Sequence, residues 1–252
     1  MKLPKGAIRL SNDIEIWKIP NFATPEQCDQ LIKDADKIGY QRSEVDSKKE
    51  AKTQSRTSST SFITHDKTQT GKILGNKAKD IVNYGLDKES INSLEGIQIQ
   101  RYYKDQKYNP HYDTFEHKDG SDQRSWTLMI YLNNVEEGGS TFFTKLGLKL
   151  KPEKGTAILW NNLDSNNCRE NKTLHMGEPV INGVKYIATY WFRKSGNQST
   201  MCPQLDDQKF NMKFQNPEVK EQTFSFYQYI CIISGFIILV FLFLVIFNLV
   251  YI

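Results

Sequence analysis

Three residues of this chain could bind a metal ion together. His111 and Asp113 stand two positions apart within the stretch Gln98–Phe115. In an extended chain alternate side chains point to the same face, so an imidazole and a carboxylate at this spacing can converge on one point. His175 lies much further along the chain and could supply a third ligand if the strands pair. Two histidines and one carboxylate, with open positions opposite, form the ligand set of non-haem Fe(II) oxygenases.

The other two histidines are weaker candidates for ligands. His117 lies in the polar stretch Glu116–Ser121, and we interpret it as a surface residue. His65 stands at the start of a predicted helix and is also not expected to bind a metal. Because the pattern His-x-Asp is short and occurs by chance, the assignment depends on the sequence around it.

The composition describes an ordinary globular domain with an apolar segment added. The chain has 252 residues, of which 38% are hydrophobic and 25% charged, and its formal net charge is +4. Residues 224–252 include no charged residue, and 229–252 are almost wholly apolar. About 20 apolar residues at a rise of ~1.5 Å cover the ~30 Å hydrocarbon core of a bilayer. The run is apolar all round rather than amphipathic, so we predict a transmembrane anchor at 227–252.

The membrane topology follows from the position of this anchor. The N-terminus lacks the apolar core of a secretory signal peptide, and a single span at the end of a chain is typical of tail-anchored proteins. We therefore expect a cytosolic domain, with a lumenal domain as the alternative. In an oxidising compartment Cys168 and Cys202 could pair, and the glycosylation sequons at Asn171 and Asn197 could be used. A cytosolic domain would leave both cysteines reduced and both sequons unmodified.

Strand and helix signals place the candidate ligands in a mainly β domain. Residues 14–19 alternate between apolar and charged, which predicts a half-buried strand. Thr24–Gln27 has the sequence of a capping box that opens a helix, which Gly39 is predicted to end. The spacing of apolar residues predicts a second helix over 66–85. Residues 55–63 are predicted to be a loop that enters a strand. Further strands are predicted at 96–103, 125–132, 141–143, 155–160 and 185–192. Short strands after two helices favour a β-sandwich or barrel with helices packed on one sheet.

Five motifs, in order and with sensible spacing, closely resemble the catalytic domain of prolyl 4-hydroxylases, which are 2-oxoglutarate- and Fe(II)-dependent dioxygenases. The motifs are EGIQIQRY at 95–102, QKYNPHYDTF at 106–115, LMIYLNNVEEGGST at 128–141, HMGEPV at 175–180 and GVKYIATYWFR at 183–193. The resemblance covers residues 14–203. It implies a double-stranded β-helix, the jelly-roll core also called cupin-like, which agrees with the predicted strands.

The resemblance assigns the iron triad to His111, Asp113 and His175. It also assigns Lys185 as the cation that pairs with the remote carboxylate of 2-oxoglutarate. The chemistry needs such a cation, because a dicarboxylate in a mostly closed pocket requires its remote charge to be compensated. An exposed strand lysine is the alternative for Lys185, and it is the weaker one because the neighbouring residues are predicted to be buried.

Further residues match the co-substrate and substrate sites of the family. Tyr102 and Thr141 match hydrogen-bond donors to 2-oxoglutarate, and Trp191 matches an aromatic residue beside the metal. The resemblance implies a peptide-binding set as well: Arg56, Ser58, Glu95 and Arg124. For this set, ordinary surface charge is an alternative of nearly equal weight.

The resemblance implies Fe(II), 2-oxoglutarate as co-substrate, O2 and L-ascorbate, and the hydroxylation of peptidyl proline with release of succinate and CO2. We predict a dioxygenase domain at 1–203, a linker at 204–226 and the anchor at 227–252, acting on a Pro-rich or collagen-like polypeptide. Departures from the family pattern at Glu178 and Arg193, and the short loop Glu116–Gln123, leave the substrate open.

Two alternatives to this function remain at the level of sequence. One is an inactive, membrane-tethered peptide-binding module, although degenerate relatives usually lose a metal ligand and this chain has all three. The other is an oxygenase of the same class that acts on another substrate. A nucleic-acid substrate would require a basic, aromatic-lined surface, and no concentrated patch of this kind stands out, so no nucleic-acid partner is expected.

Overall fold

The computed structural model describes residues 3–43, 55–64, 67–83, 91–115 and 123–194. These residues all belong to the first of two units of the chain, Met1–Cys202. Within them, none of the helices is both long enough and apolar enough to span a bilayer. Several predictions concern residues outside the described ranges: His65, His117, Asn197, Cys202, the linker at 204–226 and the anchor at 227–252.

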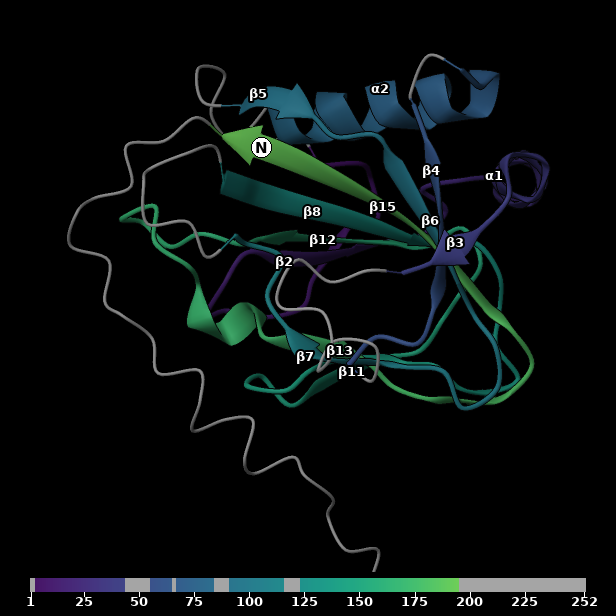
Figure 1. Cartoon of the computed structure of the whole chain (residues 1–252). Coiled ribbons are helices and arrows are strands. Elements are labelled where there is room, and N and C mark those ends of the chain that lie inside the picture. The colour runs from purple at the N-terminus through teal and green to yellow at the C-terminus, as the bar shows by residue number, and fades with distance from the viewer. Residues whose placement is uncertain (1–2, 44–54, 65–66, 84–90, 116–122, 195–252) are drawn as a thin grey trace, which may run out of the picture. The chain divides into compact units, whose positions relative to one another are not determined.

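One large antiparallel sheet dominates the described part of the chain. Its strand order is β1-β2-β12-β8-β15-β6-β4-β3, and β5 also pairs with β15. The longest strands, β8 and β15, lie side by side at its centre (Figure 1). The strands are β1 (Ile8–Arg9), β2 (Ile16–Ile19), β3 (Gln41–Arg42), β4 (Ser59–Ile63), β5 (Ile91–Leu94), β6 (Ile97–Tyr102), β8 (Gln123–Tyr131), β12 (Ala157–Asn161) and β15 (Lys185–Lys194).

A smaller sheet forms a second layer, with strand order β11-β10-β13-β7 (Figure 1). A two-stranded ribbon, β14-β9, accompanies it. The strands of these two sheets are β7 (Tyr108–His111), β9 (Glu137–Gly138), β10 (Thr141–Phe143), β11 (Leu148–Leu150), β13 (His175–Gly177) and β14 (Val180–Asn182). A short 3-10 helix, η1 (Asn171–Thr173), precedes β13.

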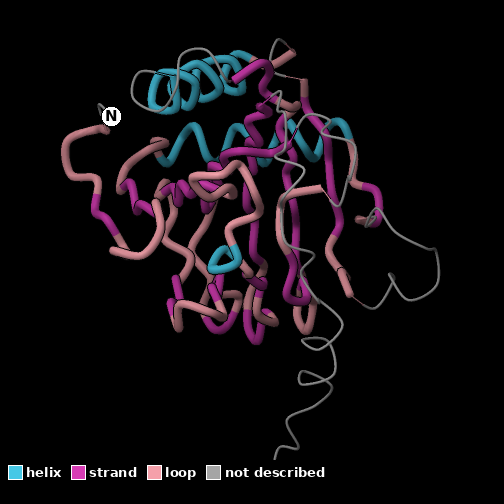
Figure 2. The backbone as a smooth tube through the Cα atoms, turned by 90° about the vertical axis from the view of Figure 1, so that its left-hand side faces the viewer, coloured by secondary structure: helices cyan, strands magenta, loops and turns pink. Residues whose placement is uncertain are grey.

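Two α-helices cover one face of the large sheet (Figures 1 and 2). They are α1 (Pro25–Ile38) and α2 (Gln69–Asn83). Strand β8 shows how the sheet serves two cores, because successive side chains point to opposite faces. Leu128 and Ile130 belong to the core cluster shared with the helices. Met129 and Tyr131 belong to a second cluster that includes Phe143 of the small sheet, so this second core lies between the two sheets.

The predicted elements agree well with the structure. The capping box is confirmed, because Thr24 Oγ1 accepts from the Gln27 backbone N–H at 3.2 Å and the Gln27 side chain accepts from the Thr24 N–H at 2.9 Å. The two helices and the main predicted strands are present with small shifts of their ends, for example α2 at Gln69–Asn83 rather than 66–85. The mainly β architecture with flanking helices is confirmed. The short strands β1, β3, β5, β7, β9, β11, β13 and β14 were not predicted.

One finding bears on the predicted topology. Cys168 is disulfide-bonded, and Cys28 is free and buried. This differs from the reduced cysteines expected of a cytosolic domain, because structural disulfides persist mainly in oxidising compartments.

Candidate active site

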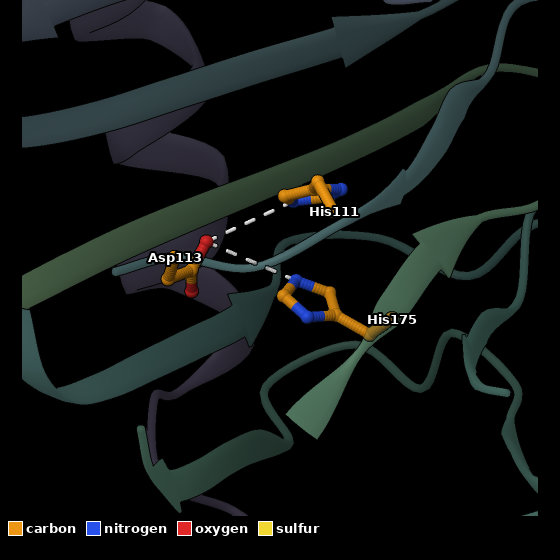
Figure 3. Close-up of side chains that lie close together, drawn as sticks. All are labelled: His111, Asp113 and His175. Atoms are coloured by element: carbon orange, nitrogen blue, oxygen red, sulfur yellow. Dashed lines mark ion pairs between the residues drawn. The ribbon is translucent and has the colours of Figure 1, made fainter. Parts of the chain in front are cut away.

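The pairing of two short strands brings the candidate ligands together. His111 is the last residue of β7 and His175 the first of β13, and the two histidines are direct partners in this antiparallel pair. Asp113 follows two residues after His111. One ligand atom of each residue lies within 4.8 Å of the others, and Figure 3 shows both imidazoles pointing toward the Asp113 carboxylate.

Hydrogen bonds to the backbone orient both imidazole rings. The Nδ1 of His111 lies 2.9 Å from the carbonyl oxygen of Asn109, and the Nδ1 of His175 lies 2.9 Å from that of Thr173. A carbonyl only accepts, so each Nδ1 carries the proton and each Nε2 keeps its lone pair. The two Nε2 atoms face Asp113 Oδ1 at 3.7 and 3.9 Å. These distances are too long for hydrogen bonds, and the three donor atoms fit a metal ion placed between them.

The charge states of the ligands also suit a metal ion. Burial lowers the pKa of His111 to about 3, and neighbouring His175 adds to this effect, so the imidazole is neutral. Burial by itself would raise the pKa of Asp113, but the adjacent imidazoles and a hydrogen bond from Thr127 outweigh it and hold the pKa below its usual value. A neutral imidazole and an ionised carboxylate are the forms that bind metals.

Aromatic side chains hold the two imidazoles in place. The ring of Tyr108 stacks on that of His111, with centroids 3.5 Å apart and planes 16° apart. The ring of Trp160 packs edge-on against that of His175, with centroids 5.1 Å apart. The centroid of the Phe143 ring lies 5.3 Å from that of His175. The surrounding residues thus restrict each ligand to one orientation, which is how residues behind a metal ligand tune a site.

Asp113 is held by a chain of two buried hydrogen bonds. The Thr127 hydroxyl donates to Asp113 Oδ2 at 2.7 Å, and the Asn162 amide donates to the Thr127 hydroxyl at 2.8 Å. Thr127 and Asn162 are both fully buried. Because Oδ2 is engaged in this way, Oδ1 remains directed at the two imidazoles.

Lys185, at the start of β15, is buried rather than exposed, with a relative accessibility of 2%. The alternative of a surface lysine is therefore wrong. Its Nζ lies 5.4 Å from the ring centroid of Tyr102 and 5.8 Å from that of Tyr131. Burial lowers the pKa of Lys185 to about 7, and the nearby carboxylate of Glu178 opposes this shift. Within the described residues no carboxylate lies at ion-pair distance from this lysine.

The other predicted co-substrate residues surround Lys185 and the triad. Tyr102 is the direct partner of Lys185 between β6 and β15, and its hydroxyl donates to Gln100 Oε1 at 2.6 Å. Thr141 is buried and pairs with Gly177 of β13. Gly177 in turn lies close to the Lys185 ammonium group, since a Cβ added to it would be 4.0 Å from Nζ. The structure therefore brings Tyr102, Thr141 and Lys185 into one region beside His175.

Trp191, predicted to lie beside the metal, is connected to Asp113 through Thr127. It is the direct partner of Thr127 between β15 and β8, and Thr127 bonds Asp113. Its indole N–H, like that of Trp160, is buried and has no hydrogen-bond partner. Buried polar groups are normally satisfied, so two such donors near the triad fit a space that receives a polar ligand.

The predicted peptide-binding residues are not scattered surface charges. Arg56 and Ser58 are buried and hydrogen-bonded to each other at 3.2 Å, and the Arg56 guanidinium lies 4.7 Å from the ring of Tyr108. Glu95 and Arg124 form a two-pronged ion pair at 2.7 and 2.8 Å. The Arg56–Ser58 pair therefore adjoins His111 through Tyr108, and the Glu95–Arg124 pair adjoins Trp191.

Sequence reasoning missed four residues that support the triad: Tyr108, Thr127, Trp160 and Asn162. The signal available for Thr127 was the alternation within β8, which places its hydroxyl on the same face as the apolar residues Met129 and Tyr131. Asn162 directly follows a buried strand, but nothing in the sequence indicates its partner. Their roles depend on contacts between distant segments.

A jelly-roll arrangement that carries two histidines, one carboxylate and a buried cation defines the class of 2-oxoglutarate- and Fe(II)-dependent oxygenases, and a sequence profile described as 2OG-Fe(II) oxygenase superfamily matches residues 97–193. The chain is 34% identical over 199 residues to Probable prolyl 4-hydroxylase 9 of Arabidopsis thaliana, covering 69% of this chain and 67% of the relative. It is also 34% identical over 231 residues to Probable prolyl 4-hydroxylase 6 of the same plant, covering 81% and 77%. This chain belongs to the prolyl 4-hydroxylase family.

Solved structures agree with this assignment. A viral collagen prolyl hydroxylase of Paramecium Bursaria Chlorella virus-1, in a 2OG complex, superposes with a TM-score of 0.60 at 34% identity, covering 71% of this chain and 95% of the viral one. A prolyl hydroxylase of Trichoplax adhaerens shares the fold at 17% identity, with a TM-score of 0.58. The protein is an enzyme of the 2-oxoglutarate-dependent dioxygenase class, and its family and His-Asp-His site imply Fe(II) and 2-oxoglutarate.

The hydrogen bond from Thr127 generates the first prediction. Thr127→Val removes the hydroxyl that holds Asp113, so the affinity for a divalent metal is expected to fall roughly 10–100-fold, as for other residues behind metal ligands. Calorimetric titration of the metal-free protein with Mn²⁺ measures this. Thr127→Ser keeps the hydroxyl and is expected to bind Mn²⁺ nearly as the unaltered protein does. Equal affinities for the Val and Ser variants would contradict the role.

Proposed function

We propose that this enzyme hydroxylates proline residues of a Pro-rich or collagen-like polypeptide. The observation that carries the proposal is the convergence of His111, Asp113 and His175 beside the buried Lys185. The names of the relatives support the choice of substrate, since the plant relatives are named as prolyl 4-hydroxylases and the viral one as a collagen prolyl hydroxylase.

Each residue of the site has a role in this proposal. His111, Asp113 and His175 would hold Fe(II) through the two Nε2 atoms and Oδ1. Lys185 would bind the remote carboxylate of 2-oxoglutarate. Thr141 would donate a hydrogen bond to it, and Tyr102 would do so by turning its hydroxyl away from Gln100. When bound, the iron and co-substrate supply the oxidation: one atom of O2 enters the proline as a hydroxyl, and the other enters succinate as 2-oxoglutarate loses CO2.

The protein contributes orientation, charge and shielding to this reaction. The backbone carbonyls of Asn109 and Thr173 fix the imidazole tautomers, so no proton has to leave a histidine when the metal binds. Trp160 and Trp191 are buried next to the ligands and exclude water from that side of the site. On the polypeptide side we assign Arg56, Ser58, Glu95 and Arg124. L-Ascorbate would serve as the reductant that keeps the iron in its Fe(II) state.

The test is an activity assay of the domain formed by residues 1–203. The domain is incubated with Fe(II), 2-oxoglutarate, ascorbate and a panel of Pro-rich and collagen-like peptides. Mass spectrometry is expected to show a gain of one oxygen on proline, with succinate formed in equal amount. His111→Ala, Asp113→Ala and His175→Ala are each expected to abolish turnover, because each removes one of three protein ligands. Succinate formation without any modified peptide would exclude prolyl hydroxylation. Activity retained in one of the variants would show that the triad is wrongly assigned.

The depressed pKa of Lys185 predicts how 2-oxoglutarate binding depends on pH. The protonated lysine binds the carboxylate, and in the free enzyme it is protonated only below about pH 7. Affinity is therefore expected to be full below that pH and to weaken by roughly tenfold for each pH unit above it. Equilibrium binding of 2-oxoglutarate to the metal-loaded protein between pH 6 and about 9 measures the effect.

Two variants of Lys185 serve as controls for this pH dependence. In Lys185→Arg the guanidinium stays protonated throughout the range, so binding is expected to be weaker than in the unaltered protein but constant with pH. Lys185→Ala leaves the remote carboxylate of bound 2-oxoglutarate buried without its cation. This loss costs roughly 3–5 kcal/mol, which lowers the affinity for 2-oxoglutarate hundreds-fold or more. An unchanged co-substrate affinity in Lys185→Ala would remove this residue from the site.

We further propose that residues 227–252 anchor the enzyme in a membrane, because of their length and apolar character. The full chain is expected to sediment with membranes and to resist extraction by alkaline carbonate, whereas a chain ending near residue 222 is expected to be soluble and active. Release of the full chain by carbonate would contradict the anchor. In sealed vesicles, added protease digests a cytosolic domain, which the sequence favours, and spares a lumenal one, which the disulfide of Cys168 favours.

A further inference from the structure

Two arginines share one carboxylate beside the active site. Arg124 donates to Glu95 through two nitrogens, at 2.8 and 2.7 Å, and Arg193 donates to the same carboxylate through Nε at 2.8 Å. Arg124 and Arg193 are direct partners between β8 and β15. Like charges opposite each other in a sheet repel, so Glu95 holds together a pair that would otherwise be unfavourable.

This cluster adjoins the metal ligands. The Arg124 guanidinium lies 3.7 Å from the ring centroid of Trp191. Trp191 is the partner of Thr127, whose hydroxyl bonds Asp113. A polypeptide that presents a proline to the triad would therefore pass within reach of these arginines.

Counted over the described residues, the cluster carries a surplus of positive charge, with two guanidinium groups against one carboxylate. The side chains are partly shielded from water, with relative accessibilities of 19% for Arg124, 20% for Glu95 and 32% for Arg193. Ionic attraction is stronger under such shielding than at an open surface. In the described part of the chain, Nε is the one nitrogen of Arg193 that donates a hydrogen bond, and the terminal nitrogens of a guanidinium are suited to a second carboxylate.

The ring of Phe115 fixes the position of this surplus charge. It lies 4.7 Å from the Arg124 guanidinium and 4.6 Å from that of Arg193. The backbone of Phe115 is in turn held by both ends of the Gln123 amide, at 2.9 and 3.1 Å. The two guanidinium groups are thus held by the Phe115 ring and by Glu95, which is the preorganisation that a binding subsite requires.

We propose that Arg193, together with Arg124, forms a subsite for an acidic side chain of the substrate, close in sequence to the proline that is hydroxylated. The inference rests on the proposed function and adds a preference among Pro-rich polypeptides. A purely structural role is the competing explanation. In that case the cluster only holds Phe115, and through it the segment that carries Asp113.

The experiment compares pairs of peptides in which one carries a Glu carboxylate and the other a Gln amide at the same position. A neutral Pro-rich peptide receives a single Glu, or a single Gln as its match, at each position up to three residues before or after the target proline. With the unaltered enzyme, KM for the Glu peptide is expected to be roughly two- to tenfold lower than for its Gln match at one or two neighbouring positions, the size expected of a partly exposed ion pair. Because salt screens such pairs, the ratio of KM for the Gln peptide to KM for the Glu peptide is expected to decrease toward one at about 0.5 M NaCl. This concentration is roughly five times the ionic strength at which the Debye length is about 10 Å.

Two variants decide between the subsite and the structural role. In Arg193→Gln the ratio of KM for the Gln peptide to KM for the Glu peptide is expected to fall to near one. In Arg193→Lys, which keeps the charge, this ratio is expected to stay above one. The matched control is Lys18→Gln, which removes a cation paired with Glu153 at 2.7 Å on a distant strand of the sheet and is expected to keep the full ratio. Because the ratio is taken within one protein, a general loss of activity in a variant does not affect it.

Direct binding makes the outcome independent of turnover. Fluorescence anisotropy measures the affinities of the same peptides, carrying a label, for the Mn²⁺-loaded protein. The Glu peptide is expected to bind more tightly than its Gln match by the same factor as in KM. Equal values for Glu and Gln peptides at every position, or a preference that persists in Arg193→Gln, would overturn the subsite. Absence of hydroxylation in every peptide, with the binding preference present, would instead refute the proposed function and leave the subsite intact.

Discussion

The pairing of β7 with β13 is the constraint on which the site depends. It places His111 opposite His175, while the backbone carbonyls of Asn109 and Thr173 turn both rings so that the unprotonated nitrogens meet. Neither strand is long, and each is held in turn by its neighbours: β13 by β10, and β7 by contacts with the segment around Arg56. A shift of one residue in this register would point one histidine to the opposite face, and the metal site would be lost.

The buried charges of the protein follow from the same arrangement. Burying an ion is costly unless it is paired, and Asp113, Lys185, Arg56 and Glu95 are all wholly or largely buried near the triad. Asp113 and Glu95 are compensated by hydrogen bonds within the protein. Lys185 lacks a carboxylate at ion-pair distance among the described residues, and its pKa is depressed accordingly. The stability lost by burying this lysine is recovered when an anionic ligand binds, which makes co-substrate affinity sensitive to pH.

The two faces of the large sheet carry different kinds of residue. In the described part of the chain, the face of the large sheet that packs on α1 and α2 is largely apolar and contains no candidate ligand. The opposite face carries Thr127, Lys185 and Trp191, which point toward the small sheet and its histidines. Because side chains alternate along each strand, every strand that supports the site also contributes to the core behind it. Substitutions on the helix-facing side therefore affect stability, whereas those on the other face affect both the second core and metal or ligand binding.

The sequence alone determined the ligand types, their spacing, the capped first helix and the main strands, because these depend on local propensity and on the period-two alternation of side chains. It also indicated Lys185, Tyr102 and Thr141 through the family motifs. Only the tertiary structure decided that Thr127 and Asn162 hold Asp113, that Tyr108 stacks on His111, and that Arg193 and Arg124 share Glu95. The physical reason is that these contacts join strands distant in the chain, whose order and register arise from the packing of the whole sheet rather than from any single segment.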